Sequence, residues 1–189
     1  ENSQTDKVTI ITHSNGGLVA KGLMIKLEEQ GLDHLIDKII FTAPPFLGTP
    51  KGMAAVLHGY GQGLGAIVPA TDRKGREVAK NITSAYHLMP NEVLVNDYWG
   101  DSYYVDFNIE NEYINQLFGN DHGSQLNDFS EYQIFLYENK YRDFNSSGDS
   151  LNVPGEINES LWQRAVENHN KLRTWQPSDE LDVFVIAGY

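Results

Sequence analysis

Ser14 is the residue of this chain whose setting best suits nucleophilic chemistry. It comes just after the apolar run of residues 7–12 and is followed by Asn15, Gly16 and Gly17, after which apolar residues recur at helical spacing. A sharp turn from a strand into a helix needs small residues, because the two backbones come close together. Such a turn exposes its apex at the carboxyl end of the strand, where ligands bind in open α/β sheets. The spacing therefore predicts a nucleophile elbow with Ser14 at its apex and both glycines in structural roles.

The residues beside Ser14 are expected to support it. A helix beginning after Ser14 would point its free N–H groups and the positive end of its dipole at the serine. We expect the N–H of Asn15 to be the first oxyanion donor, and one such donor is worth about 3–4 kcal/mol. Thr12 and His13 are expected to be structural, because successive strand residues point to opposite faces and His13 should point away from the substrate. The alternative is a plain strand–helix turn in which Ser14 caps the helix.

The elements that would position this turn follow from short apolar runs. Residues 7–12 (KVTIIT), 38–43 (KIIFTA) and 181–188 (LDVFVIAG) predict strands, and their almost uninterrupted apolar character is typical of strands covered on both faces. A helix of about four turns is expected between the first two strands, with Gly31 as its stop signal. Strand, helix and strand in this order predict a right-handed βαβ unit with parallel strands, and therefore an α/β fold.

A long segment of different composition separates the second strand from the third. Residues 98–144 hold 13 of the chain's 21 aromatic residues, and residues 98–160 carry 12 acidic against two basic residues, a net charge of −10. Connections of this length are usually lids or binding segments. The aromatic residues either form the segment's own core or cover an apolar acyl chain. Ser160 and Gln163 have capping-box spacing, which predicts that a helix opens there.

The expected organisation is thus an α/β core with a large insertion. The core would comprise strand, elbow, helix and strand, the insertion would be a cap or lid, and the chain would then return to the core with a last strand. The expected boundaries are residues 1–50 for the core, 51–176 for the insertion and 177–189 for the returning strand.

Composition excludes several partners and kinds of site. The net charge of −12 argues against nucleic acid and anionic membrane surfaces as partners. No apolar run is long enough to span a bilayer, and no signal peptide is recognised. The absence of cysteine excludes disulfides and thiolate metal sites but does not fix the compartment; the composition fits a secreted enzyme and many other proteins. We predict no metal site, and the oligomeric state is left open.

Two further motifs favour structural interpretations. The glycine-rich residues 59–65 (GYGQGLG) lack the strand and the Lys-Ser/Thr of a phosphate-binding loop, so we expect a lid hinge. Residues 143–149 (DFNSSGD) resemble the start of a calcium loop, but Pro154 stands where the bidentate glutamate belongs, so we expect a solvated turn.

Four segments, in the same order, resemble α/β-hydrolase lipases and lecithin:cholesterol-acyltransferase-like proteins. Residues 12–17 (THSNGG) are similar to the lipase elbow, with Thr12 where the family usually has glycine. Residues 38–52 (KIIFTAPPFLGTPKG) are similar to the strand and Gly-Thr/Ser-Pro turn that follow it. Residues 82–91 (ITSAYHLMPN) are similar to a Leu-Met-Pro segment of the cap, and residues 182–189 (DVFVIAGY) to the strand before the catalytic acid.

This resemblance implies a serine hydrolase that acts on acyl esters or lipid-like substrates, or transfers their acyl group, through an acyl-serine intermediate and without a cofactor. It also implies that the catalytic Asp and His lie after residue 189 and a second oxyanion donor before residue 1, so that the hydrolase core is incomplete at both ends. A histidine of the insertion, such as His122 next to Asp121, is the alternative base. Other readings are an amidase or thioesterase on the same fold, or an inactive binding module.

Overall fold

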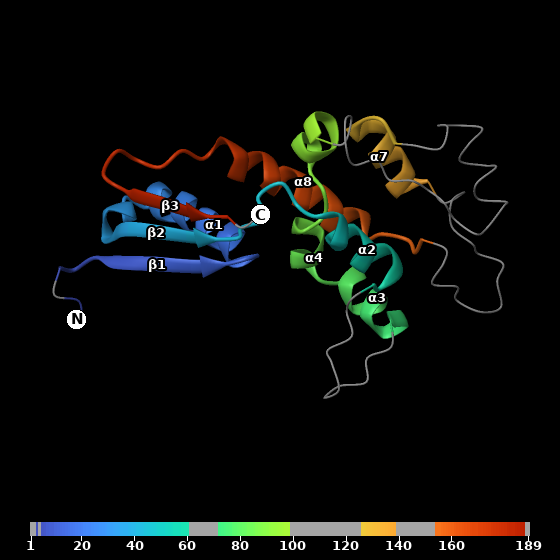
Figure 1. Cartoon of the computed structure of the whole chain (residues 1–189), viewed down its shortest axis with the longest axis horizontal. Helices are drawn as coiled ribbons and strands as arrows, with labels where there is room; N and C mark the ends of the chain where they lie inside the picture. Colours follow the sequence, from blue (N-terminus) through green and yellow to red (C-terminus); the bar gives the residue numbers. More distant parts are fainter. Residues whose placement is uncertain (1–2, 4, 61–71, 99–125, 139–153, 188–189) are drawn as a thin grey trace. The chain divides into compact units, whose positions relative to one another are not determined.

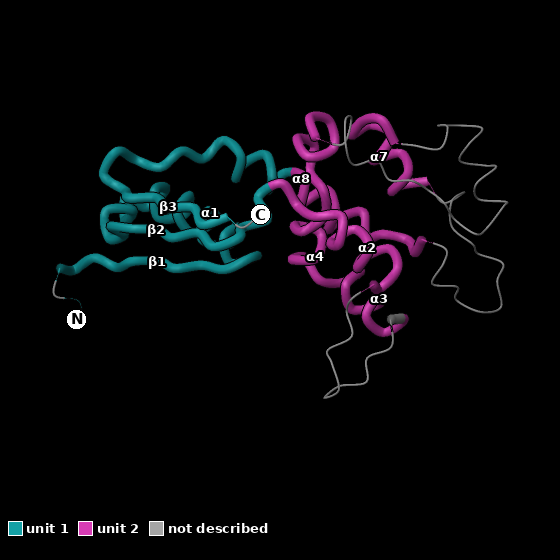
Figure 2. Tube along the Cα trace, viewed as in Figure 1, with its two compact units in different colours: residues 1–46, 167–189 teal, residues 47–166 magenta. Residues whose placement is uncertain are grey.

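The computed structural model describes residues 3, 5–60, 72–98, 126–138 and 154–187. The chain divides into two compact units, shown in Figure 2. Unit 1 comprises residues 1–46 and 167–189, and unit 2 comprises residues 47–166. The insertion predicted from the sequence spans residues 51–176, and its role as a lid stays a prediction.

Unit 1 contains a parallel sheet of three strands in the order β1-β2-β3. Strand β1 (Val8–His13) leads into helix α1 (Gly16–Glu29), which is followed by the 3₁₀ turn η1 (Asp33–Leu35) and strand β2 (Ile36–Thr42). Strand β3 (Asp182–Ile186) pairs with the other side of β2. The arrows of all three strands point the same way in Figure 1, and the pairing of Ile10 with Ile39 gives the register. The predicted parallel strand–helix–strand unit is therefore confirmed.

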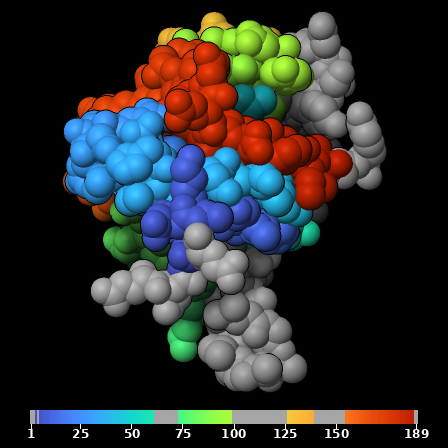
Figure 3. Space-filling model, turned by 90° about the vertical axis from the view of Figure 1, so that its left-hand side faces the viewer, coloured from blue at the N-terminus to red at the C-terminus, as the bar shows by residue number. Residues whose placement is uncertain are grey.

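The core of unit 1 lies between the sheet and α1. Met24 of α1 and Ile39 and Phe41 of β2 are almost fully buried there. In Figure 3 the red residues leading to β3 lie beside the light-blue residues around β2. The expectation that all three strands are covered on both faces is wrong for the described residues, since Ile11 is 72% exposed and Phe184 is 51% exposed. The reason is that α1 covers only one face of the sheet: Ile11 pairs with Ile40 and Ile40 with Phe184, so these side chains share the face opposite to that of the buried Ile39 and Phe41.

Unit 2 is helical in the residues that the structure describes. Helices α2 (Pro50–His58), α3 (Asp72–Lys80) and α4 (Thr83–His87) come first, followed by the π-helical turn η3 (Leu94–Tyr98) and helix α7 (Phe129–Tyr137). Helix α8 (Glu159–Thr174) begins in unit 2 and ends in unit 1. None of the described helices is long and apolar enough to cross a membrane.

Aromatic side chains fill the core of unit 2. Tyr132 and Trp162 are fully buried, and their rings meet edge to face with centroids 5.8 Å apart. Phe135 is buried with them, and the ring of Phe129 lies 6.1 Å from that of Trp162. Of the two roles left open for the aromatic residues of the insertion, these four serve as core. Of the other aromatic residues in the enriched segment, Tyr137 packs against this core and Tyr98 is exposed, and the rest lie outside the described residues.

Helix α8 begins two residues earlier than the capping box suggested. The side chain of Asn158 accepts a hydrogen bond from the backbone N–H of Leu161 at 3.3 Å, and the hydroxyl of Ser160 donates to the same Asn158 oxygen at 2.8 Å. Asn158 is therefore the N-cap, and the prediction that Ser160 caps the helix with Gln163 is wrong. Both residues can cap, but burial of Trp162 and Ala165 fixes the first turns of the helix.

Two segments that carry the resemblance to lipases pack against each other in unit 2. The N–H of Thr49 donates to the carbonyl of Leu88 at 2.8 Å, and the N–H of Asn91 donates to the carbonyl of Leu47 at 3.0 Å. A side chain on Gly48, whose φ is +81°, would overlap the carbonyl of Met89. The two backbones thus approach so closely that only glycine fits between them.

Several sequence features lie outside the described residues. These are His122, the calcium-like residues 143–149 and residues 61–65 of the glycine-rich segment. Gly59, at the start of that segment, is described and ends α2 with a φ of +70°.

Candidate active site

Ser14 occupies the turn between β1 and α1. Its backbone is left-handed, with a φ of +53°, and its side chain is exposed. The backbone N–H of Ser14 donates to the carbonyl of Thr42 at 3.0 Å, which continues the hydrogen bonding between β1 and β2 by one residue. Serine rarely adopts this conformation, which costs about 1–2 kcal/mol. The turn is therefore held by its neighbours rather than by the preference of the residue itself.

The first turn of α1 leaves N–H groups pointing away from the helix. Gly17 donates to the carbonyl of Ser14 at 2.9 Å, and Leu18 donates to that of Asn15 at 3.1 Å. The N–H groups of Asn15 and Gly16 donate to no other residue that the structure describes. Asn15 is the N-cap, and its side chain accepts no capping bond from the described helix. The cap position thus belongs to Asn15, which argues against the alternative in which Ser14 caps the helix.

The two glycines after Asn15 differ in what their neighbours allow. A Cβ atom on Gly17 would lie 2.8 Å from the Cβ of Pro44 and 3.4 Å from the ring of Phe46, closer than side chains pack. A Cβ atom on Gly16 would lie 3.5 Å from the Cβ of Thr12, which is an ordinary contact. The close approach of strand and helix therefore requires glycine at position 17, whereas Gly16 and Thr12 are compatible without crowding.

A second left-handed residue ends the neighbouring strand. Ala43 follows β2 with a φ of +46°, and its N–H donates to the carbonyl of Ile186 in β3 at 2.8 Å. Ser14 and Ala43 thus follow the carboxyl ends of two adjacent parallel strands and lie at the same end of the sheet's hydrogen-bonded ladder. The chain after Ala43 brings Pro44 and Phe46 against Gly17. Sequence reasoning did not single out Ala43, and an alanine followed by two prolines carries no local signal of a left-handed turn.

Within unit 1, the described residues supply no base for Ser14. The hydroxyl of Ser14 makes no hydrogen bond with a described histidine of this unit. His13 lies in β1, where it pairs with Thr42, and its side chain is exposed. No cluster of three or more His, Asp or Glu side chains that could hold a metal ion occurs among the residues described. Of the predicted site residues, the structure brings together Ser14, Asn15 and the two glycines.

Unit 2 contains a surface hollow of about 440 Å³. Two of its polar side chains accept hydrogen bonds from backbone N–H groups. Asn96 accepts from the N–H of Phe129 at 2.8 Å, and Asp128 caps α7 by accepting from the N–H of Glu131 at 2.9 Å. We therefore assign these two side chains a structural role. The hollow is lined by Glu92, Asn96, Asn127, Asp128, Phe129, Ser130 and Gln133.

Comparison with known proteins identifies one family. The family model described as lecithin:cholesterol acyltransferase matches residues 1–142, three-quarters of the chain, including the turn at Ser14 and both segments that pack at Gly48. No curated protein and no solved structure matches the chain. The family match implies an α/β-hydrolase fold and an enzyme of the lipid acyltransferase or esterase type with a lipid substrate. With a match over three-quarters of its length, the chain belongs to the lecithin:cholesterol acyltransferase family.

Proposed function

We propose that Ser14 is the nucleophile of an enzyme that hydrolyses lipid esters or transfers their acyl groups. The observation that carries this proposal is the turn itself. An exposed serine in a left-handed conformation stands directly before a helix whose first N–H groups, those of Asn15 and Gly16, donate to no other described residue. Nucleophile elbows expose their serine in this way.

The proposed reaction has two stages. The Ser14 Oγ attacks the acyl carbonyl while a general base takes its proton, and the alcohol of the substrate leaves with a proton from that base. The N–H of Asn15 donates to the oxygen of the tetrahedral intermediate, where the N-terminus of α1 favours negative charge. Water or a second alcohol then attacks the acyl-serine. We expect the base and its acid partner to be the His and Asp that the family places after residue 189.

Unit 2 is proposed to act as the cap over the acyl chain. The support is its position in the chain between β2 and β3, together with the aromatic enrichment of the segment. An enzyme of this type must shield a hydrocarbon chain from water next to its serine. Amide or thioester substrates on the same serine, and an inactive binding module, remain the alternatives to ester chemistry.

The test is labelling with a fluorophosphonate, which reacts with activated serines. The natural protein that contains this chain would be labelled and digested, and the modified peptide identified by mass spectrometry. We expect label on Ser14, its loss in Ser14→Ala, and its retention in Ser130→Ala, an exposed serine of α7 that serves as the matched control. A folded protein that takes no label at Ser14 would overturn the proposal. Ester, thioester and amide substrates of equal chain length then separate the remaining alternatives.

A further inference from the structure

Lys21 of α1 is held between two aromatic rings. Its Nζ lies 4.3 Å from the ring centroid of Phe46 and 5.7 Å from that of Trp175, and it donates to the carbonyl of Leu172 at 3.4 Å. No described carboxylate forms a salt bridge with this ammonium group. Most lysines leave their charge in water, because burying it without compensation is costly. Here two ring faces and one carbonyl provide the compensation.

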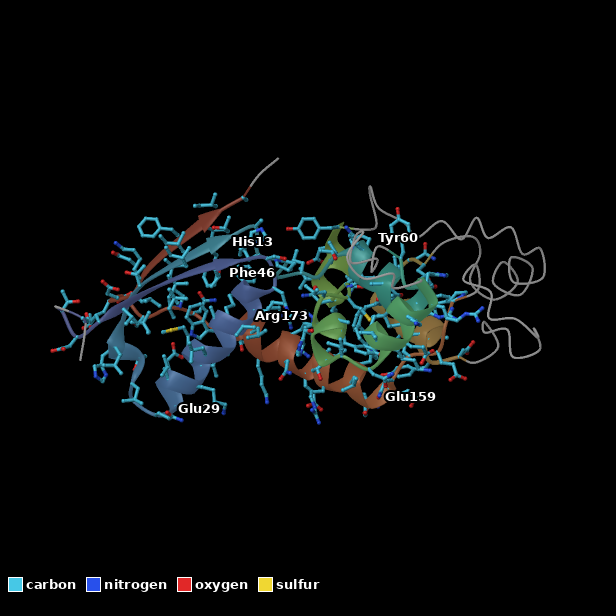
Figure 4. The ribbon with its side chains drawn as sticks, turned by 90° about the horizontal axis from the view of Figure 1, so that it is seen from below. His13, Glu29, Phe46, Tyr60, Glu159 and Arg173 are labelled. Atoms are coloured by element: carbon cyan, nitrogen blue, oxygen red, sulfur yellow. The ribbon has the colours of Figure 1, made fainter. Side chains whose placement is uncertain are left out.

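The ring of Phe46 in turn supports the start of α1. It packs edge to face on Phe41, with centroids 5.1 Å apart, and it would lie 3.4 Å from a Cβ atom on Gly17. Gly17 and Lys21 are four residues apart and therefore share one face of the helix. Lys21 thus covers the ring that packs against Gly17 in the first turn of α1. Figure 4 shows Phe46 at this end of α1 and Glu29 at the other.

The end of α8 and the residue that follows it complete the arrangement. Leu172, in the last turn of α8, and Trp175, just after it, contact Lys21, and the indole N–H of Trp175 donates to the Glu28 carboxylate at 2.7 Å. Helix α1 is thus fastened to this segment at Lys21 and again two turns further on. Burial lowers the pKa of the Lys21 ammonium, as expected for a charge taken partly out of water.

We propose that Lys21 is a positioning residue for the chemistry at Ser14. Its ammonium clamps the ring of Phe46, and the clamped ring fixes the first turn of α1 and its N–H donors relative to β2. This inference rests on the proposed function of Ser14. The donors act on charge that develops in the transition state, so misplacing them lowers kcat and leaves KM nearly unchanged.

The test uses Lys21→Met, which keeps the length of the side chain and removes its charge. In the natural protein that contains this chain, we expect kcat and the rate of fluorophosphonate labelling at Ser14 to fall by about 10–100-fold, with KM changed by less than about threefold. Lys21→Arg retains a cation over the rings and should stay within about threefold of the unsubstituted protein. The matched control is Lys26→Met, on the same helix, where the exposed Lys26 pairs with Glu29 at 2.7 Å.

The outcomes separate the two proposals. If the unsubstituted protein takes no label at Ser14, the proposed function fails. If it is labelled and Lys21→Met is labelled equally fast, the positioning role fails while the nucleophile stands. A fall in Lys21→Met that Lys21→Arg does not rescue would also overturn it. Phe46→Leu offers a second approach should Lys21→Met not fold: it removes the ring face with Lys21 in place, and it should lower the labelling rate similarly.

Discussion

Different kinds of interaction stabilise unit 1 and unit 2 internally. In unit 1 the backbone dominates: three parallel strands exchange hydrogen bonds, Ser14 and Ala43 extend this bonding past the strand ends, and several apolar side chains of the edge strands are exposed. In unit 2 side chains dominate, because short helices pack around fully buried aromatic residues such as Tyr132 and Trp162. The hydrogen-bonded sheet of unit 1 fixes the positions of backbone groups, whereas the buried side chains of unit 2 stabilise that unit by removing apolar surface from water.

This difference separates the expected effects of substitutions. Changes around the turn of Ser14 should alter the direction of N–H groups, and thus chemistry, more than stability. Changes inside unit 2 should reduce the stability of that unit. Hydrogen exchange read out by mass spectrometry distinguishes the two, since it reports protection peptide by peptide.

The largest effect on stability is expected for Gly48→Ala. The new Cβ would overlap the carbonyl of Met89, and the left-handed backbone adds its own cost, so we expect a loss of about 2–5 kcal/mol in the free energy of unfolding. Gly31→Ala is the control from unit 1: its φ of +68° is similar, but nothing lies within 4 Å of the added atom. It should cost only about 1 kcal/mol. Equal losses in denaturant titrations would contradict the close approach at Gly48.

An intermediate effect is expected for Tyr86→Phe. The buried hydroxyl of Tyr86 donates to the carbonyl of Lys80 at 2.8 Å and accepts from the N–H of Asn158 at 2.7 Å, and so joins α3 to the cap of α8. Its removal leaves both groups unsatisfied and should destabilise unit 2 by about 1–3 kcal/mol.

The counterpart of Tyr86→Phe in unit 1 is Glu28→Gln. It keeps a neutral acceptor for Trp175 at an exposed position and should cost at most about 0.5 kcal/mol. Thermal melts of both variants check this order, and the reverse order would contradict the division of roles between side chains and backbone.

The smallest effect concerns His87, at the end of α4. Burial lowers its pKa below the usual value for histidine, so the unfolded chain takes up a proton at a higher pH than the folded chain does. Stability is therefore lost as the pH falls from about 6.5 through the lowered pKa. Melting temperatures between about pH 8 and pH 5 should fall less steeply for His87→Gln than for the unsubstituted protein. At about pH 8 the difference between the two should no longer change with pH. Parallel curves over the whole range would exclude His87 as the source of acid sensitivity.

Local patterns predicted the elements of unit 1 well. The strands, the length of α1 and its end at Gly31 follow from apolar spacing and glycine placement, and the observed bounds differ by about two residues. The turn at Ser14 was predictable for the same reason, because a strand, small residues and a helix follow one another directly. The exposure of Ile11 was not, since an apolar run does not reveal whether both faces of a strand are covered.

Contacts between residues far apart in the chain could not be predicted from the sequence. The packing of Gly48 on Met89 and the clamp of Lys21 on Phe46 join positions whose local sequence gives no sign of the partner. The choice of Asn158 over Ser160 as cap has the same origin, because both residue types cap helices equally well and tertiary packing decides between them. The sequence therefore left open mainly which side chains from distant parts of the chain contact one another.

For the proposed nucleophile Ser14, folding and chemistry favour different residues at this position. Glycine and asparagine adopt the left-handed conformation at less cost than serine, so the folded chain would gain stability by losing its hydroxyl there. Without selection for activity, substitution of this serine by glycine or asparagine would be retained because it stabilises the folded chain. A descendant that has given up catalysis should therefore show it first at this position, and serine persisting there in a lineage would record selection on activity.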